Sequence, residues 1–143
     1  MRIWAFFLTA MVAVSAAADD NAVKYRQHTM EAVGGHMQAI VQIVKGEVDH
    51  KDHITVHTSS LAALSTIAPD LFGADSKTGA DTEALPKIWE DPDLFKQRLD
   101  AFRSSAQDLD AAAKTGDMAK IGAALGPVGK SCKGCHDDFK KKD

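Results

Sequence analysis

The sequence predicts an all-α protein folded as an antiparallel four-helix bundle. Apolar residues recur at alternating spacings of three and four along four separate stretches, which is the period of an amphipathic helix. Connections punctuated by glycine and proline join these stretches, and all but one are short. No stretch alternates apolar and polar residues as a half-buried strand does. At 143 residues the chain has the length of one domain.

Residues 1–18 have the features of a secretory signal peptide. A positive start at Arg2 precedes an apolar run that ends at Val14, and three consecutive alanines then form a small-residue cleavage pattern before Asp19. The apolar run is too short for a permanent membrane span, and no later segment resembles one. We therefore expect residues 1–18 to be cleaved and residues 19–143 to form the bundle.

The composition is that of an ordinary soluble globular protein, with 45% hydrophobic and 26% charged residues. The formal net charge of −3 gives no indication of a nucleic-acid-binding surface. Five lysines nevertheless gather near the C-terminus: Lys130, Lys133, Lys140, Lys141 and Lys142. Cations that compensate a helix dipole explain them more simply than a basic rim that orients acidic partners, although both can hold.

The first helix is expected from about Asp20 to Lys45, ending at Gly46. Its inward positions follow a steady 3-4 alternation: Val23, Arg26, Met30, Val33, Met37, Ile40 and Val44. The pair Gly34–Gly35 interrupts it, at a cost of about 1 kcal/mol per glycine relative to alanine. This pair is either a weak point or a place where another group approaches the backbone closely.

A second helix is expected from about Asp49 to Ala68, ended by Pro69. Its apolar stripe consists of Ile54, Leu61, Leu64 and Ile67 or Ala68. It also holds a group of histidines: His50, His53 and His57. The last two have the i, i+4 spacing of a metal-binding pair, but the sequence places no third strong ligand beside them, which argues against a physiological metal site.

Residues 69–90 form the one long irregular stretch, which is unusual in a compact domain. Five apolar residues should fasten it to the bundle: Leu71, Phe72, Leu85, Ile88 and Trp89. We expect Trp89 to lie in the core and to hold this crossover against the helices.

The third helix is expected to start near Pro92, with Asp91 as its N-cap. Its inner face consists of Phe95, Arg98 or Leu99, Phe102, Ala106, Leu109 and Ala113. After Gly116, Asp117 can cap a fourth helix, in which Pro127 should cause a local kink. The inner face of the fourth helix is Met118, Ile121, Leu125, Val128, Cys132, Cys135 and Phe139.

The segment Cys132–His136 reads Cys-Lys-Gly-Cys-His, the attachment motif of a c-type haem. Each thiol can add to one vinyl group of the porphyrin, and the histidine can bind the iron. A structural zinc site usually needs four ligands, and a thioredoxin-like pair should accompany a βαβ pattern. A plain disulfide would leave His136 unexplained. The sequence therefore predicts one covalently bound haem inside the bundle, because Cys132 and Cys135 fall on the inner face of the last helix.

The chain resembles the cytochrome c′ family, the class II c-type cytochromes, over the whole of residues 19–143. The resemblance rests on four segments: Val23–Gln27, Gly35–Met37, Pro86–Trp89 and Val128–His136. A haem motif near the C-terminus is itself distinctive of class II. A four-helix bundle is the fold that this resemblance implies.

The resemblance assigns roles to individual residues. It implies that Cys132 and Cys135 bind the haem covalently and that His136 is the proximal ligand. Arg26 and Gln27 match family positions that contact the haem propionates, which a guanidinium can pair with. In a further segment, Lys140 stands where many members have arginine, which keeps the charge but loses the planar fork.

Met30 matches the family position that faces the open side of the haem. As a sixth ligand, its thioether would give Met/His iron with a raised potential suited to electron transfer. As an apolar wall, it would leave a five-coordinate iron open to nitric oxide or carbon monoxide. Residues 74–79 resemble the loop of low-spin members, which favours a six-coordinate iron with Met30 as ligand. Met37, further along the helix, is a weaker candidate.

The sequence thus predicts a periplasmic single-electron carrier, because bacterial c-type haem is attached outside the cytoplasmic membrane. The alternative is a five-coordinate cytochrome c′ that binds nitric oxide or carbon monoxide. An exported metal-binding bundle that uses the histidine group of the second helix is disfavoured. The sequence shows no pairing of a nucleophile with a base that would indicate a classical enzyme. Redox partner proteins or gas ligands are the expected partners, and a homodimer through the first two helices is common in the family.

Overall fold

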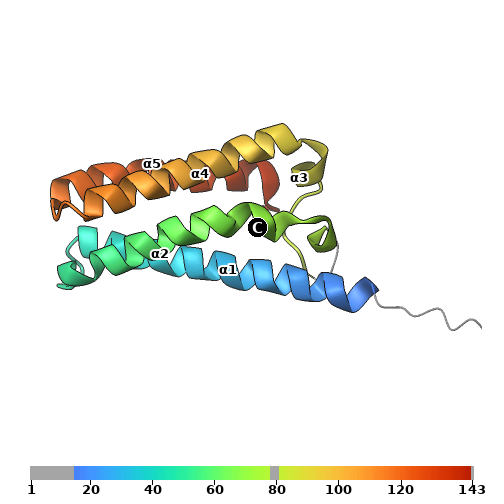
Figure 1. The fold of residues 1–143 in the computed structure, drawn as a ribbon, viewed down its shortest axis with the longest axis horizontal. Coiled ribbons are helices and arrows are strands. Elements are labelled where there is room, and N and C mark those ends of the chain that lie inside the picture. The colour runs from blue at the N-terminus through green and yellow to red at the C-terminus, as the bar shows by residue number, and fades with distance from the viewer. Residues whose placement is uncertain (1–14, 78–80, 143) are drawn as a thin grey trace, which may run out of the picture.

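The computed structural model describes residues 15–77 and 81–142, and it confirms the four-helix bundle. The four long helices are α1 (Ser15–Val44), α2 (Ile54–Ile67), α4 (Pro92–Ala113) and α5 (Met118–Phe139). In Figure 1, α1 and α2 form one layer and α4 and α5 the other. α4 packs chiefly against α5 and α2, whereas α5 meets α1 at few positions. No helix among the described residues is long and apolar enough to cross a membrane.

Helix α1 begins earlier than the sequence predicts and runs without a break through Gly34–Gly35 to Val44. Both glycines are exposed, and a Cβ atom added at either would meet nothing within 4 Å. Within the described chain, therefore, no group approaches the backbone closely at this pair. Gly46 has a positive φ of 71°, which ends the helical segment where predicted. Of the predicted signal peptide, residues 1–14 lie outside the described residues.

Helix α2 is shorter than predicted because residues Lys51–His53 form a separate 3₁₀ turn before it. Ile54 and Leu61 are buried as expected. At the end of the stripe Ala68 is buried, while Ile67 is 36% exposed. The helix also buries two hydroxyl residues that the apolar pattern did not indicate, Thr58 and Ser65.

The crossover between α2 and α4 contains two 3₁₀ turns, η2 (Ala68–Phe72) and η3 (Ala74–Ser76), and the short helix α3 (Lys87–Glu90). Leu71 and Ile88 are buried and anchor it, as predicted. Trp89 is only half-buried, which corrects the prediction that it lies in the core. Its indole Nε1 still ties the crossover together, because it donates to the Phe72 carbonyl at 2.9 Å.

Both predicted N-caps are present. The Asp91 carboxylate accepts a hydrogen bond from the Leu94 amide at the start of α4. The Asp117 carboxylate accepts one from Ala119 at 2.9 Å and one from Lys120 at 3.3 Å at the start of α5. These bonds satisfy amides that have no partner within the helix. Pro127 lies inside α5, which remains one continuous helix.

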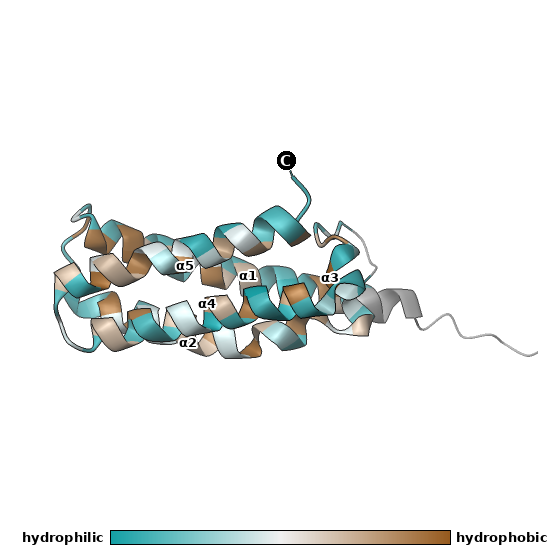
Figure 2. Ribbon diagram, turned by 90° about the horizontal axis from the view of Figure 1, so that it is seen from above, coloured by the Kyte–Doolittle hydropathy of each residue, from teal (hydrophilic) through white to brown (hydrophobic). Residues whose placement is uncertain are grey.

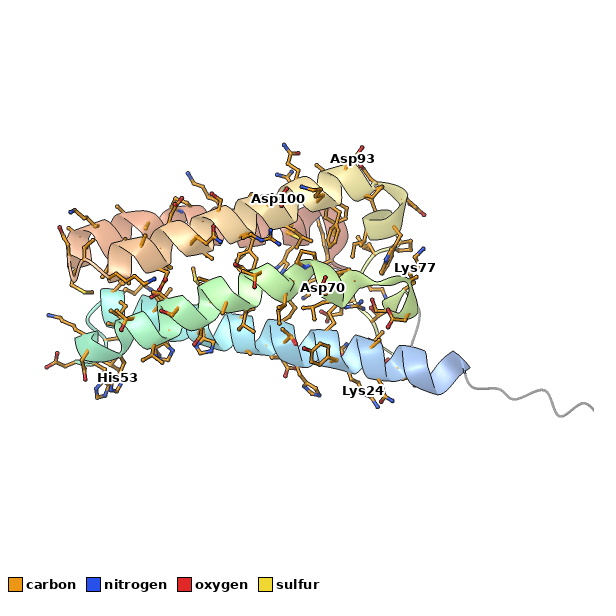
Figure 3. The ribbon with its side chains drawn as sticks, in the orientation of Figure 1. Lys24, His53, Asp70, Lys77, Asp93 and Asp100 are labelled. Atoms are coloured by element: carbon orange, nitrogen blue, oxygen red, sulfur yellow. The ribbon has the colours of Figure 1, made fainter. Side chains whose placement is uncertain are left out.

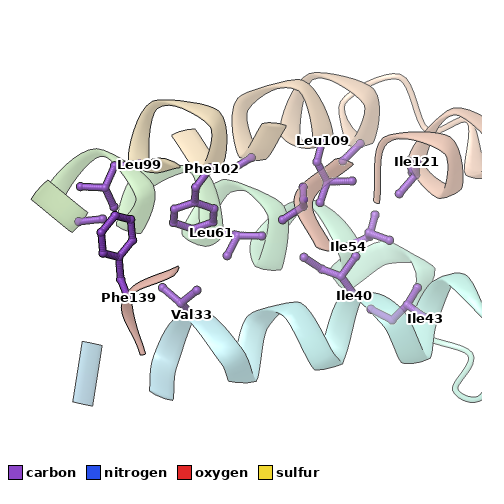
Figure 4. Close-up of a cluster of buried hydrophobic side chains, with 14 of the residues drawn as sticks. Val33, Ile40, Ile43, Ile54, Leu61, Leu99, Phe102, Leu109, Ile121 and Phe139 are labelled. Carbon is purple, nitrogen blue, oxygen red and sulfur yellow. The ribbon is translucent and has the colours of Figure 1, made fainter. Parts of the chain in front are cut away.

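The core lies along the bundle axis between the two layers (Figure 4). Each fully buried aliphatic side chain there contributes about 1.5–3 kcal/mol relative to an exposed one. At one end, the ring of Phe95 makes edge-to-face contacts with those of Phe72 and Phe139. Figure 2 shows that each long helix has both hydrophilic and hydrophobic residues, as the amphipathic pattern requires.

Asp110 of α4 is the one carboxylate in this interior among the described residues. Its Oδ1 accepts hydrogen bonds from Thr58 at 3.0 Å and Ser59 at 2.8 Å, both from α2. Its other oxygen pairs with Lys114 Nζ at 2.6 Å. The buried charge is thereby satisfied, and it joins α4 to α2.

Candidate haem-attachment site

The two cysteines lie on the inner face of α5, one helical turn apart. Both are free thiols of intermediate burial, and both pack against the core cluster. Burial raises the pKa of the Cys132 thiol. Burial, followed by the neighbouring Cys132, raises the pKa of Cys135 to about 11. Both therefore remain protonated thiols at neutral pH and face an apolar environment.

His136 follows directly and is exposed in the chain alone. Its pKa is lowered chiefly by partial desolvation, and the positive charge of Lys140 lowers it further. The imidazole is therefore neutral at pH 7, which is the form that binds iron. Two free thiols at this spacing and an adjacent neutral imidazole are the donor set that a covalent haem requires, so the residues fit this group.

The end of α5 is tied to the crossover. The amide of Leu85 donates to the Phe139 carbonyl at 2.9 Å, and the amide of Lys141 donates to Glu83 at 2.8 Å. Lys140 also pairs with the Glu83 carboxylate at 2.9 Å. These bonds surround an isolated β-bridge between Ala84 and Lys140. The helix turn that presents His136 is therefore fixed by a segment some 50 residues earlier in the chain.

Arg98 of α4 lies over the haem motif, which the sequence did not indicate. A Cβ atom on Gly134 would lie 3.4 Å from Arg98 Nη1. The guanidinium also donates to Asp138 at 2.9 Å. That distance is an ordinary van der Waals contact, so the guanidinium lies against the motif at Gly134 and joins α4 to the last turns of α5.

Arg26 is 4% exposed and fastens α1 to the crossover. Its guanidinium donates to the Ser76 carbonyl at 2.9 Å and to Thr82 Oγ1 at 2.8 Å, and it lies over the Phe72 ring. Desolvation lowers the pKa of Arg26, and Asp75 opposes this shift. No carboxylate among the described residues forms an ion pair with it, and the oxygens that it donates to are neutral.

Gln27 and Met30 are the other two residues of α1 that the sequence assigns to the haem site. Gln27 Nε2 donates to the Asp81 carbonyl at 3.1 Å. Met30, one turn beyond Arg26, is half-buried and packs against the core cluster, and so does Met37. Burial therefore does not distinguish Met30 from Met37. Their positions along α1 do distinguish them, since only Met30 lies within one helical turn of Arg26.

The three histidines that the sequence places together on the second helix make two separate contacts in the structure. His50 and His53 stack with ring centroids 4.9 Å apart and lie before α2. His57 instead contacts His36 of α1, with the two Nδ1 atoms 3.1 Å apart. Sequence analysis missed His36 because only the packing of α1 on α2 brings the two rings together.

Two pockets among the described residues do not include the thiol pair, although Ser131, next to Cys132, lines the second. One, of about 470 Å³, lies beside Trp89 and Phe95. The other, of about 460 Å³, lies beside Pro127 between α4 and α5. Neither cysteine lines either pocket, so the thiol pair and imidazole identify the site.

Comparison with known proteins agrees with this assignment. The profile of the family described as cytochrome c′ matches residues 21–140. Cytochrome c′ of Rubrivivax gelatinosus is 37% identical over 123 residues, covering 85% of this chain and 95% of the relative. Its crystal structure covers 88% of this chain and 99% of its own, with a TM-score of 0.82. A cytochrome c-554 of Cereibacter sphaeroides is 33% identical over 144 residues, covering 96% of this chain and 94% of the relative.

A second solved relative is a nitric oxide complex of a cytochrome c′ variant from Alcaligenes xylosoxidans. It is 37% identical, covers 89% of this chain and 98% of its own, and has a TM-score of 0.80. Together with the thiol pair and imidazole at the end of α5, these matches over nearly the whole bundle identify the chain as a c-type cytochrome with one covalently bound haem, a member of the cytochrome c′ family.

Proposed function

We propose that this cytochrome holds a five-coordinate haem that binds nitric oxide or carbon monoxide at its open face. The observation that supports this most is the nitric oxide complex of the Alcaligenes xylosoxidans relative, which matches 89% of this chain. The haem supplies an iron centre that takes a small diatomic ligand. The main prediction from sequence, Met30 as a sixth ligand, becomes the second candidate.

In this proposal each residue of the site has a separate task. Cys132 and Cys135 attach the haem, and the neutral imidazole of His136 is the single protein ligand of the iron. Arg26 and Gln27 hold the crossover against α1 and place a buried positive charge where haem propionates can use it. Met30 contributes an apolar wall, consistent with its packing against the core.

The second candidate is a single-electron carrier in which Met30 ligates the iron. Met30 supports it by position, because it is a half-buried thioether one helical turn from the buried Arg26. Methionine as second axial ligand raises the reduction potential and fills the coordination site that a gas would need. The two candidates therefore differ in one bond: Met30 Sδ binds the iron in the electron carrier and does not in the gas-binding protein.

We further propose that the protein is exported to the periplasm and that residues 1–18 are removed as a signal peptide. We also propose that it acts as a ligand-binding or redox protein rather than an enzyme. Redox partner proteins and a second copy of the chain remain its proposed protein partners. Tyr25 and Val56, from the two helices of one layer, are 61% and 62% exposed, which is compatible with a dimer through this layer.

An optical spectrum of the reduced, haem-loaded protein with and without carbon monoxide tests the proposal. A broad high-spin spectrum that shifts when carbon monoxide is added is the expected result. A narrow low-spin spectrum that carbon monoxide leaves unchanged would overturn it in favour of the electron carrier. Nitric oxide is then added to the same sample, and we expect a second, distinct shift.

A further inference from the structure

His50, Asp52 and His53 bring three potential metal ligands together in the connection between α1 and α2. Their donor atoms all lie within 4.8 Å of one another, and all three side chains are exposed. Asp52 Oδ2 and His53 Nε2 are 3.6 Å apart. Two ligands of one tetrahedral zinc ion, each at about 2.0–2.2 Å from it, lie about 3.3–3.6 Å apart. Asp52 and His53 therefore already have nearly the separation that a shared ion requires.

The local backbone explains why the imidazoles of His50 and His53 meet. Residues Lys51–His53 form a 3₁₀ turn, and the His53 amide donates to the His50 carbonyl at 3.0 Å. Side chains three residues apart are eclipsed in a 3₁₀ helix. The two rings consequently stack, with centroids 4.9 Å apart and planes within 7° of parallel. A single turn of chain thus holds all three donor groups.

Stacked rings do not direct two lone pairs at one point, so one imidazole must turn out of the stack to share an ion with the other. The side chains of His53 and Asp52 are 55% and 81% exposed, and exposed side chains change rotamer within nanoseconds. The His50 ring has to bring its donor atom from within 4.8 Å of the others to about 3.3 Å. This rotation moves no backbone and displaces no buried group.

We infer that His50, Asp52 and His53 bind a divalent transition-metal ion, with water completing the coordination. Imidazole is a ligand that zinc, copper and nickel ions favour, and zinc also accepts a carboxylate oxygen. Residues 47–53 contain three carboxylates and one lysine, so this segment attracts a cation. The sequence argued against a metal site because it paired His53 with His57 and placed no third ligand beside them. The structure supplies His50 and Asp52 in place of His57.

The site is separate from the haem-attachment site. It precedes α2, whereas the crossover that is tied to the end of α5 follows α2. The 14 residues of α2 span about 20 Å. Figure 3 shows His53 at one end of the bundle and Lys77, of the crossover, near the other. The inference therefore stands independently of which ligands the haem iron takes.

His36 and His57 form a rival pair of imidazoles between α1 and α2. Their Nδ1 atoms are 3.1 Å apart, at hydrogen-bond distance, so one nitrogen donates its proton to the other and neither is free for an ion. Among the described residues, no histidine, cysteine or acidic side chain joins them as a third ligand. The set of His50, Asp52 and His53 is therefore the better metal site.

Calorimetric titration of zinc chloride into the zinc-free, haem-loaded protein at pH 7.5 tests the inference. Haem loading engages both thiols and His136, so they cannot bind the zinc. We expect one zinc ion per chain, and at least tenfold weaker binding in each of His50→Ala, Asp52→Asn and His53→Ala. The haem spectrum of each variant should be unchanged, which verifies that it is folded.

His28→Ala is the matched control. His28 Nδ1 lies 3.3 Å from Glu31 Oε2, so this variant removes another exposed imidazole beside a carboxylate and should leave the zinc affinity unchanged. His36→Gln removes one member of the rival pair and should also leave it unchanged. As a second readout, zinc should raise the unfolding temperature of the unmodified protein and not that of His50→Ala.

Absence of zinc binding to the unmodified protein would overturn the inference. So would retention of the full affinity in any one of the three ligand variants, because that side chain would then not be a ligand. Loss of binding in His36→Gln would assign the ion to the rival pair, and equal loss in His28→Ala would show that zinc binds exposed histidines without selectivity.

Discussion

The guanidinium of Arg26 donates a hydrogen bond to the carbonyl oxygen of Ser76 at 2.9 Å, across 50 residues of the chain. A second bond to Thr82 and the contact with the Phe72 ring complete the attachment of α1 to the crossover. Arg26 thus has a structural role in addition to the propionate contact that the family resemblance implies. Its buried charge makes both roles compatible, because its partners in the described chain are neutral.

Replacement of Arg26 by methionine should destabilise the protein by about 2 kcal/mol, because hydrogen bonds from a charged donor are lost and buried acceptors lose their partner. The free energy of unfolding is measured by urea titration of the haem-loaded protein. Lys24→Met, at an exposed position two residues earlier on α1, is the matched control and should change it by less than about 0.5 kcal/mol. Equal effects of the two substitutions would contradict a structural role for Arg26.

Replacement of Met30 by alanine should leave the position and spin state of the haem absorption bands unchanged, because the thioether is proposed to be a wall and not a ligand. Gas binding should become tighter or faster as the wall is removed. Met37→Ala, at the next methionine along α1 and likewise half-buried against the core, controls for the loss of packing. A change from low-spin to high-spin bands in Met30→Ala alone would show that Met30 ligates the iron.

Asp110 should make the stability of the protein pH-dependent. Burial raises the pKa of this carboxyl, but hydrogen bonds from Lys114, Ser59 and Thr58 outweigh it and hold the pKa below its ordinary value. A folded-state pKa below the unfolded value, about 3.9, gives stability that is present above pH 3.9 and lost as pH falls through the folded value. Asp110→Asn should therefore be less stable by about 1–3 kcal/mol at pH 7.

The difference between the native protein and Asp110→Asn should shrink as the pH falls below about 4, as measured by urea unfolding at several pH values. Asp108→Asn removes an exposed carboxylate from the same helix and should show no such gap at pH 7. A constant difference between native protein and Asp110→Asn from pH 7 to pH 3 would contradict the role assigned to the charge.

Loss of one thiol should weaken haem retention less than loss of both thiols. Cys132→Ala and Cys135→Ala should each keep one thioether bond, whereas the double variant should release its haem on acid–acetone extraction. Haem in the extracted phase is measured by absorbance. Ser131→Ala, next to the motif, should retain all of its haem. Complete retention in the double variant would contradict covalent attachment through these residues.

Much of the fold follows from the sequence because the determining interactions are local. Asp91 and Asp117 cap helices through amides only two or three residues away, so their spacing alone predicts them. The inner faces of α4 and α5 follow from periodicity, which is a property of a single helix. The haem donors are contiguous in the chain, and the motif was therefore recognisable before any packing was known.

Tertiary structure decided the interactions that cross between elements. Periodicity gives the face that a helix buries but leaves its axial shift against a neighbour undetermined. That shift places His36 against His57 and sets the Asp110 carboxylate opposite Thr58. It also decides that Gly34–Gly35 faces open space. The sequence by itself thus determined the bundle and the haem attachment, whereas the partners of each polar side chain inside it depended on how the four helices fit together.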